Sequence, residues 1–197
     1  HYGVTAYPTA TYNFYHTTTS PQNASHIMGQ ISSLWKAEGA EAGIAATSIV
    51  ANTCVVVNTE VKAAVENEYR VTAWLLEDNI YGKQSVYPDP YKGTGELIQP
   101  LEGVNFNNHN NTIRLADSKA TNTDFSGFSL GVIEAGKTAS REFAFKLKPN
   151  GNGSLSKWNH DNLRVIVFIS TKEGNKWLVN NVVKCPKDGS VDFEYAE

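Results

Sequence analysis

Two pairs of neighbouring side chains are the first candidates for chemistry in this sequence. Glu77 and Asp78 end an alternating segment, and His160 stands next to Asp161. Successive strand residues point to opposite faces, so Glu77 and Asp78 cannot readily share a substrate or a metal ion. We expect a solvated strand end there. His160 and Asp161 could form an acid–base pair, but no nucleophile stands near them, and we expect no catalytic residue at either place.

His109 and Arg114 are surface candidates in an asparagine-rich segment, residues 105–114. His109 has no histidine or cysteine at the spacing of a metal site, so we expect no metal ion. Asparagine tolerates left-handed backbone and bonds the backbone of its own turn. A turn built from asparagines therefore explains this composition without a ligand.

The two cysteines, Cys54 and Cys185, leave two alternatives open. They are too far apart in sequence for a CxxC redox pair and too few for a zinc cluster. A disulfide requires alpha-carbons within about 7 Å, which the sequence does not establish. The other alternative, which we favour, is two buried free thiols.

Three tyrosines, Tyr81, Tyr87 and Tyr91, lie in or beside a segment rich in proline and glycine. Exposed aromatic rings of this kind can stack on a glycan, and they can equally cover the edge of a sheet. The sequence contains no GxSxG, HExxH or glycine-rich phosphate loop. We therefore expect no enzyme activity and no cofactor.

Composition excludes further classes of function. The 197 residues carry a net charge of −3, which gives no basic footprint for nucleic acid. The longest apolar runs, such as "RVIVFIS", have the length of a strand, so no segment can span a bilayer as a helix. A hydrophobic content of 41% is in the globular range.

The elements that must position these side chains are mostly strands. Alternation predicts strands over residues 43–51, 53–64, 68–78, 110–116, 127–133, 140–148, 163–171, 176–185 and 190–196. The second half of 68–78 is apolar on both faces, which is typical of a central, covered strand. We predict that residues 85–108 form a long loop outside the strands of the sandwich and that residues 117–128 form an additional loop. The absence of interleaved helices favours an antiparallel sandwich.

The opening residues differ from the remainder. Residues 5–16 read as two short strands around Pro8. A helix is predicted from Pro21 to about residue 37, with Ser20 as its N-cap and an apolar stripe that includes Ile27 and Ile31. This stripe needs a partner, and our hypothesis is that it packs on the sandwich or on a second copy of the chain.

These residues resemble the carboxyl-terminal third of a thioredoxin fold. Residues 4–9 match its turn around a cis-proline, which makes Pro8 the candidate cis-proline, and the hairpin "TATYNFYH" and the helix follow in order. In thioredoxins the residue before this proline, here Tyr7, lies against a CxxC disulfide. This chain has no CxxC, so thiol–disulfide exchange would need one upstream of residue 1.

The remainder is similar to the carboxyl-terminal region of the twenty-eight-kilodalton outer membrane protein family, envelope lipoproteins of Bacteroides-type bacteria. The segments that carry the resemblance are "VTAWLLEDNIYGKQ" (71–84), "NHNNTIRLA" (108–116), "LRVIVFIS" (163–170) and "VNNVVKC" (179–185). One departure is Phe106, where the family usually has tyrosine. The resemblance implies an immunoglobulin-like sandwich after a thioredoxin-like front part, an extracytoplasmic location in the periplasm or at the outer-membrane surface, and a lipid anchor on an upstream segment.

Together these observations predict a mainly-β chain, with a partial thioredoxin-like segment over 1–41 and an immunoglobulin-like antiparallel β-sandwich over 42–197. The function we expect is a non-enzymatic binding or structural module of the bacterial cell envelope, with a protein or glycan partner and a homo-oligomer contact through 1–41. One alternative is the back half of a thiol–disulfide oxidoreductase. Another is a carbohydrate-binding module that uses the three tyrosines.

Overall fold

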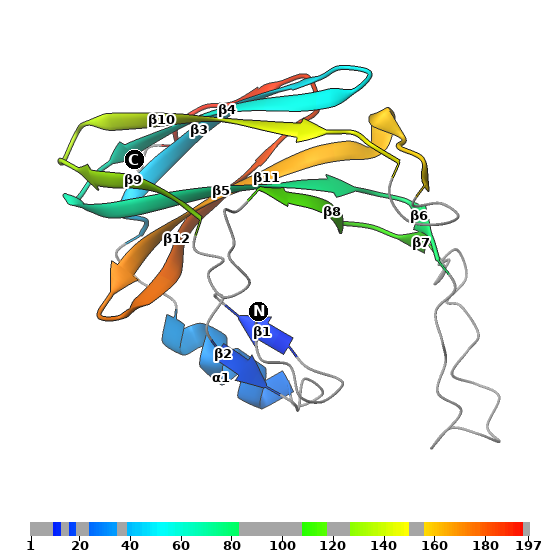
Figure 1. Cartoon of the computed structure of the whole chain (residues 1–197). Coiled ribbons are helices and arrows are strands. Elements are labelled where there is room, and N and C mark those ends of the chain that lie inside the picture. Colours follow the sequence, from blue (N-terminus) through cyan, green and yellow to red (C-terminus); the bar gives the residue numbers. More distant parts are fainter. Residues whose placement is uncertain are drawn as a thin grey trace, which may run out of the picture.

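Two antiparallel sheets, packed face to face, form the main body of the protein (Figure 1). The structure is a computed structural model, and it describes residues 10–12, 16–18, 24–34, 39–82, 108–117, 127–149 and 156–194. The first sheet has the order β10-β4-β3-β13, with strands β3 (Ala42–Val50), β4 (Cys54–Ala63), β10 (Thr138–Lys146) and β13 (Ser190–Val191). The second has the order β12-β11-β5-β8, with strands β5 (Asn67–Glu77), β8 (Thr112–Asp117), β11 (Leu163–Glu173) and β12 (Lys176–Cys185). Strand β9 (Phe128–Ile133) also pairs with β5. The expected mainly-β antiparallel sandwich is confirmed.

The core lies between the sheets because alternate residues of each strand are apolar. Along β5 the inward residues Tyr69, Val71, Ala73 and Leu75 are fully buried. Strand β4 of the first sheet and strand β11, the neighbour of β5 in the second sheet, contribute β-branched side chains, which suit the pleated surface of a sheet. The buried β-branched residues are Val55, Val57 and Val61 of β4 and Val165, Val167 and Ile169 of β11. Each such side chain contributes about 1.5–3 kcal/mol on burial.

The outer face of β5 is covered as well, as its sequence predicts. Leu76 exposes 2% of its surface, and Thr72 exposes none. Beside them the ring of Trp74 meets Phe168 edge to face, with 5.0 Å between the centroids. The central strand of the second sheet is therefore buried on both faces, and its register is strongly specified.

Tyr69 ties the start of β5 to two neighbouring backbone segments. Its hydroxyl lies 2.6 Å from the carbonyl oxygen of Val65 and 3.1 Å from that of Glu41. Burial, with a smaller effect from the negative charge of Glu41, raises the pKa of Tyr69 to about 12. Because the phenolate is disfavoured in the folded chain, the unfolded chain loses this proton first as the pH rises.

Tyr69→Phe is therefore expected to flatten the alkaline limb of the stability curve. The contribution of the Tyr69 proton is fully present below the ordinary tyrosine pKa of about 10 and is lost as the pH rises to about 12. Urea unfolding of both chains between pH 9 and 12 measures the difference. If the free energy of unfolding fell equally steeply with pH in the two chains over this range, the raised pKa of Tyr69 would be contradicted.

The edge strand β10 carries a charged side chain on its inner face. Arg141 lies opposite Thr59, whose hydroxyl donates to the Arg141 carbonyl oxygen at 2.7 Å. The guanidinium carbon of Arg141 is 3.5 Å from the ring centroid of Phe128. An inward-pointing charge at a sheet edge disfavours the addition of another strand.

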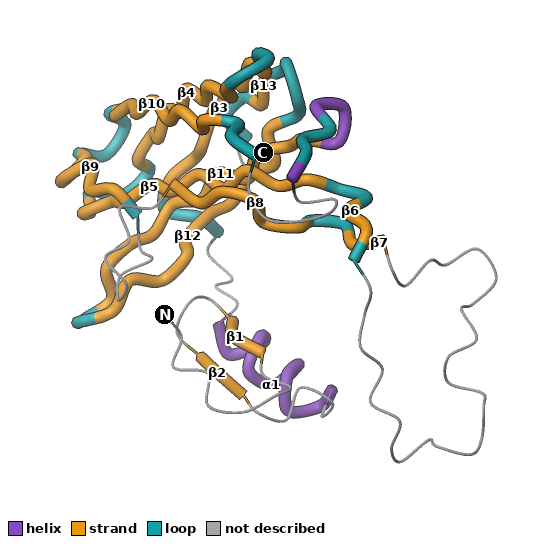
Figure 2. The backbone as a smooth tube through the Cα atoms, turned by 45° about the vertical axis from the view of Figure 1, so that its right-hand side comes forward, coloured by secondary structure: helices purple, strands orange, loops and turns teal. Residues whose placement is uncertain are grey.

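The N-terminal elements form a separate group on the side of the second sheet (Figures 1 and 2). Strands β1 (Ala10–Tyr12) and β2 (His16–Thr18) pair antiparallel, and α1 runs over Ala24–Leu34. Both described strands follow Pro8 rather than flank it, while Ser20, Pro21 and Pro8 itself lie outside the described residues. On α1, Ile31 is exposed, so the partner of its apolar stripe stays a prediction. So do the likeness to thioredoxin and the domain boundary at residue 41.

Most strand boundaries agree with the sequence within two residues, and two differences matter. The last strand is expected over 190–196, but β13 covers only Ser190–Val191, and 192–194 are not in a strand. A short pairing between β6 (Ile80–Tyr81) and β7 (Asn108–His109) was not predicted. No helix among the described residues is long and apolar enough to cross a bilayer.

Candidate functional site

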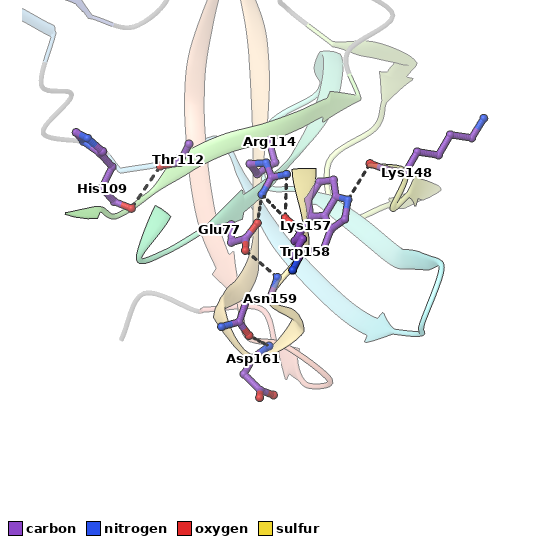
Figure 3. Close-up of polar contacts among 9 residues, drawn as sticks. All are labelled: Glu77, His109, Thr112, Arg114, Lys148, Lys157, Trp158, Asn159 and Asp161. Atoms are coloured by element: carbon purple, nitrogen blue, oxygen red, sulfur yellow. Dashed lines mark hydrogen bonds and ion pairs between the residues drawn. The ribbon is translucent and has the colours of Figure 1, made fainter. Parts of the chain in front are cut away.

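Strand ends and turns meet at one end of the sandwich, where β5 finishes and β8 and β11 begin. We call this region, residues 77–82, 108–114 and 156–164, the loop end. It contains most of the polar side chains that the sequence singles out, and Figure 3 shows its central contacts.

A buried ion pair lies at the centre of the loop end. Arg114 donates through Nη1 to Oε2 of Glu77, and the two side chains expose only 4% and 3% of their surface. The expectation of a solvated strand end is therefore wrong for Glu77. A signal for its burial was present, because Glu77 shares the face of Tyr69, Val71, Ala73 and Leu75.

A β-bulge brings the arginine to this position. The register of β5 and β8 shifts so that Leu75 lies opposite Leu115 and Leu76 opposite Ile113. Arg114 is the extra residue between them, and bulges re-aim a side chain in this way. Its guanidinium thereby reaches the inner face, where Glu77 lies.

A third segment, residues 157–159, closes over the pair (Figure 3). The backbone N–H of Asn159 donates to Oε1 of Glu77 at 2.8 Å, so both carboxylate oxygens accept a bond from the chain. The guanidinium carbon of Arg114 lies 4.0 Å from the ring centroid of Trp158, and both of its terminal nitrogens are 3.4 Å from the Lys157 carbonyl oxygen. Trp158 is fixed in turn, because its indole N–H donates to the carbonyl of Lys148 at 2.8 Å. Glu77 therefore acts as a structural brace that joins β5, β8 and residues 157–159.

The neighbouring Asp78 has different partners. It forms an ion pair with Arg164, and its Oδ1 accepts the backbone N–H of Asn111 at 2.7 Å. The side chain of Asn110 accepts from the backbone N–H of Asn79 at 3.0 Å, and Asn79 and Asn111 both have positive φ. The asparagines therefore build the turns of the loop end, as their local chemistry favours.

His160 and Asp161 do not form an acid–base pair with each other. They lie in a 3₁₀ turn, η2 (His160–Asn162), and Asp161 binds the ammonium of Lys187 at 2.7 Å. This contact lowers the pKa of Asp161 and raises the pKa of Lys187. Asp161 is thereby held as a carboxylate.

The remaining surface candidates are placed apart from the ion pair. His109 is 2.9 Å through Nε2 from the carbonyl oxygen of Gly82, and Tyr81 is exposed over 52% of its surface. Tyr87 and Tyr91 lie outside the described residues. A surface built from all three tyrosines stays a prediction. Across the described ranges, no three His, Cys, Asp or Glu side chains gather as they would around a metal ion.

An open cavity of about 370 Å³ adjoins the brace. It is lined by Glu77, Asn79, Ile80, Lys157, Trp158, Asn159, His160 and Asn162. A larger cavity of about 680 Å³ is at the opposite end of the sandwich, where much of the lining is glycine and alanine. The larger cavity also has an aromatic residue, Phe193, with three polar residues. The cavity at the loop end is the more polar of these two, because all of its lining residues except Ile80 and Trp158 are polar, and polar groups beside an aromatic residue are typical of ligand sites.

Cys54 and Cys185 are both free thiols in the structure, so the disulfide alternative does not hold there. The thiol of Cys185 is fully buried, with its sulfur 3.6 Å from the carbonyl oxygen of Ala46. Burial raises the pKa of Cys185, and a hydrogen bond with Ser48 offsets part of that rise. A buried thiol with a raised pKa reacts slowly.

Thiol labelling is expected to separate the two cysteines. In a Cys54→Ser chain, Cys185 should react with iodoacetamide at least about tenfold more slowly when folded than when unfolded in urea. The Cys185→Ser chain is the matched control, because Cys54 is only half-buried and should react faster when folded. Fewer than two thiols in the urea-unfolded, unreduced protein would contradict the free state.

Comparisons with known proteins identify the family of this chain. The sequence profile of the outer membrane protein Omp28 family matches residues 1–188. A search of solved structures matches the chain to the crystal structure of a domain of the outer membrane lipoprotein Omp28 from Porphyromonas gingivalis, with 11% identity, a TM-score of 0.42, and coverage of 78% of this chain and 93% of that one. A search of curated proteins gave no match. The chain belongs to the Omp28 outer membrane protein family, which confirms the resemblance seen in its sequence and the extracytoplasmic, outer-membrane-associated location expected from it.

Proposed function

We propose that this protein is a non-enzymatic binding module of the outer membrane and that its loop end is the recognition surface. The observation that carries this proposal is the internal pairing of charges around the cavity. Glu77 pairs with Arg114, Asp78 with Arg164, and Asp161 with Lys187. These carboxylates are occupied as structural contacts, which suits a rigid binding surface better than acid–base chemistry.

Rigidity supports the same proposal. Side chains already fixed by packing and hydrogen bonds lose little freedom when a ligand binds. The loop end is braced by the bonds of Glu77 to Arg114 and Asn159 and by the anchored ring of Trp158. The exposed residues beside this brace can therefore present a fixed arrangement to a partner.

The test uses two exposed lysines at opposite ends of the sandwich. Lys157 lines the cavity, and Lys137 lies in the turn between β9 and β10. Lys157→Glu and Lys137→Glu make the same change in charge. Binding of the intact chain to immobilised outer-membrane vesicles, prepared from a Bacteroides-type bacterium that lacks its own Omp28 protein, gives an apparent affinity for each variant.

Lys157→Glu is expected to weaken vesicle binding by about tenfold, a change of about 1.4 kcal/mol, and Lys137→Glu to leave it unchanged within about twofold. Equal losses in the two variants would indicate general electrostatic attraction to the membrane. That result, or the absence of any binding by the unaltered chain, would overturn the assignment of the loop end.

A further inference from the structure

We propose that the cavity at the loop end binds one pyranose unit of a glycan, with the indole of Trp158 as its stacking surface. This inference rests on the proposed function and narrows the ligand to a chemical class. It also moves the glycan surface away from the three tyrosines, because Tyr81 is not among the residues that line the cavity.

The indole ring of Trp158 is already held in place by contacts within the chain. Trp158 lines the cavity, its N–H is bound to the Lys148 carbonyl, and Arg114 lies over the ring at 4.0 Å. Because Arg114 covers one face of the ring and the ring also packs against the core, the contact area that Trp158 offers a ligand is the part that lines the cavity, and that part is already fixed at little entropic cost. The C–H face of a pyranose is the kind of partner that such a ring accepts, because it is apolar while the rim of the sugar is polar.

Polar residues line the cavity beside the ring of Trp158. Asn79, Asn159, Asn162 and His160 all line the same cavity. An amide offers both donors and an acceptor, which matches hydroxyl groups that donate and accept at once. Part of this capacity is used within the chain, since the Asn159 side chain accepts the backbone N–H of Asp161 at 3.1 Å.

The charges at the cavity limit the kind of sugar that can bind there. Glu77 is the carboxylate that lines the cavity, and Arg114 neutralises it. Lys157 adds an exposed ammonium at the rim, which can donate either to a hydroxyl or to an acidic group. The site therefore suits a pyranose that is neutral or carries one acid. A volume of about 370 Å³ is near the small end of ligand pockets, which fits a single sugar unit better than a long chain.

The test is isothermal titration calorimetry of the intact chain with two sets of methyl glycosides. The neutral set contains methyl glucoside, galactoside, mannoside and N-acetylglucosaminide, and the acidic set contains methyl glucuronide and galacturonide. Binding of at least one member supports the proposal, and the set to which it belongs identifies the source of the ligand. Binding of none at millimolar concentration would overturn the proposal.

Two variants locate the binding without disturbing the brace. Asn79→Gly keeps the positive φ of that turn while removing the amide, and combined with His160→Ala it should weaken sugar binding about five- to tenfold. Asn175→Gly, in the hairpin loop at the opposite end, is the matched control and should leave binding unchanged. Full sugar binding by the Asn79→Gly, His160→Ala chain would overturn the assignment to this cavity.

Vesicle binding separates this inference from the proposed function. If Lys157→Glu weakens vesicle binding but no glycoside binds, the loop end is still the recognition surface and the sugar class is wrong. If Lys157→Glu has no effect beyond that of Lys137→Glu and no glycoside binds, both proposals fail.

Discussion

Replacing Arg114 by methionine is expected to lower the free energy of unfolding by about 3–5 kcal/mol. The change leaves the carboxylate of Glu77 buried, with the backbone N–H of Asn159 as its remaining bond from this cluster. It also removes the guanidinium from the ring of Trp158. Urea unfolding followed by circular dichroism at neutral pH measures the loss.

Two controls make this result specific. Arg164→Met breaks the ion pair with Asp78, in which the two side chains expose 17% and 27% of their surface, and it should lower the free energy of unfolding by less than Arg114→Met does. The double change Arg114→Met with Glu77→Leu removes both buried charges and should recover much of the stability, because an apolar pair can replace a buried ion pair. A loss below about 1 kcal/mol for Arg114→Met alone would show that the pair is not a brace.

Gly127→Ala is expected to destabilise the chain by about 3 kcal/mol or more. Gly127 has a φ of +96°, a conformation that costs an L-residue about 1–2 kcal/mol. In addition, a methyl group there would overlap the hydroxyl of Thr72 and lie 2.5 Å from the carbonyl oxygen of Val71. Both neighbours belong to the central strand β5, which is buried on both faces and cannot yield easily. Overpacking of this kind adds about 1–3 kcal/mol.

Gly136→Ala is the matched control for the second effect. Gly136 also has positive φ, +78°, but a methyl group there meets nothing within 4 Å. Gly136→Ala should therefore lower the free energy of unfolding only by the cost of the positive φ, about 1–2 kcal/mol. Equal melting temperatures for the two alanine variants would contradict the close approach of Gly127 to β5.

The strands could be predicted from the sequence because alternation depends on neighbouring residues alone. The paired faces of β5, β10 and β11 follow from that pattern. The same alternation places Glu77 on the inner face of β5. A carboxylate at the end of a strand is, however, equally compatible with exposure to solvent, and the sequence did not show that Arg114 would pair with it. A β-bulge at Arg114 brings this residue to Glu77, which lies 37 positions earlier in the chain. The position of the bulge depends on the register between β5 and β8.

The candidate site could be predicted only in part, because it joins three distant segments. His109, Arg114 and the asparagines stand out by type, whereas Trp158 and Asn159 carry no motif, and their role depends on tertiary contact with β5 and β8. The pairing of β6 with β7 spans two residues on each side, too short for any periodic signal. Local chemistry explains the positive φ of Asn79 and Asn111, which asparagine tolerates, but the bonds that join the two turns link residues 31 and 33 positions apart and have no local signal.

Hydrogen exchange followed by mass spectrometry tests most directly whether the loop end is the surface that meets the outer membrane. The intact chain is labelled with and without outer-membrane vesicles from a Bacteroides-type bacterium that lacks its own Omp28 protein. The expected result is slower exchange in peptides that cover residues 77–82, 108–114 and 156–164. Slower exchange confined to the opposite end, at residues 39–43, 62–64 and 134–138, would contradict the proposed recognition surface.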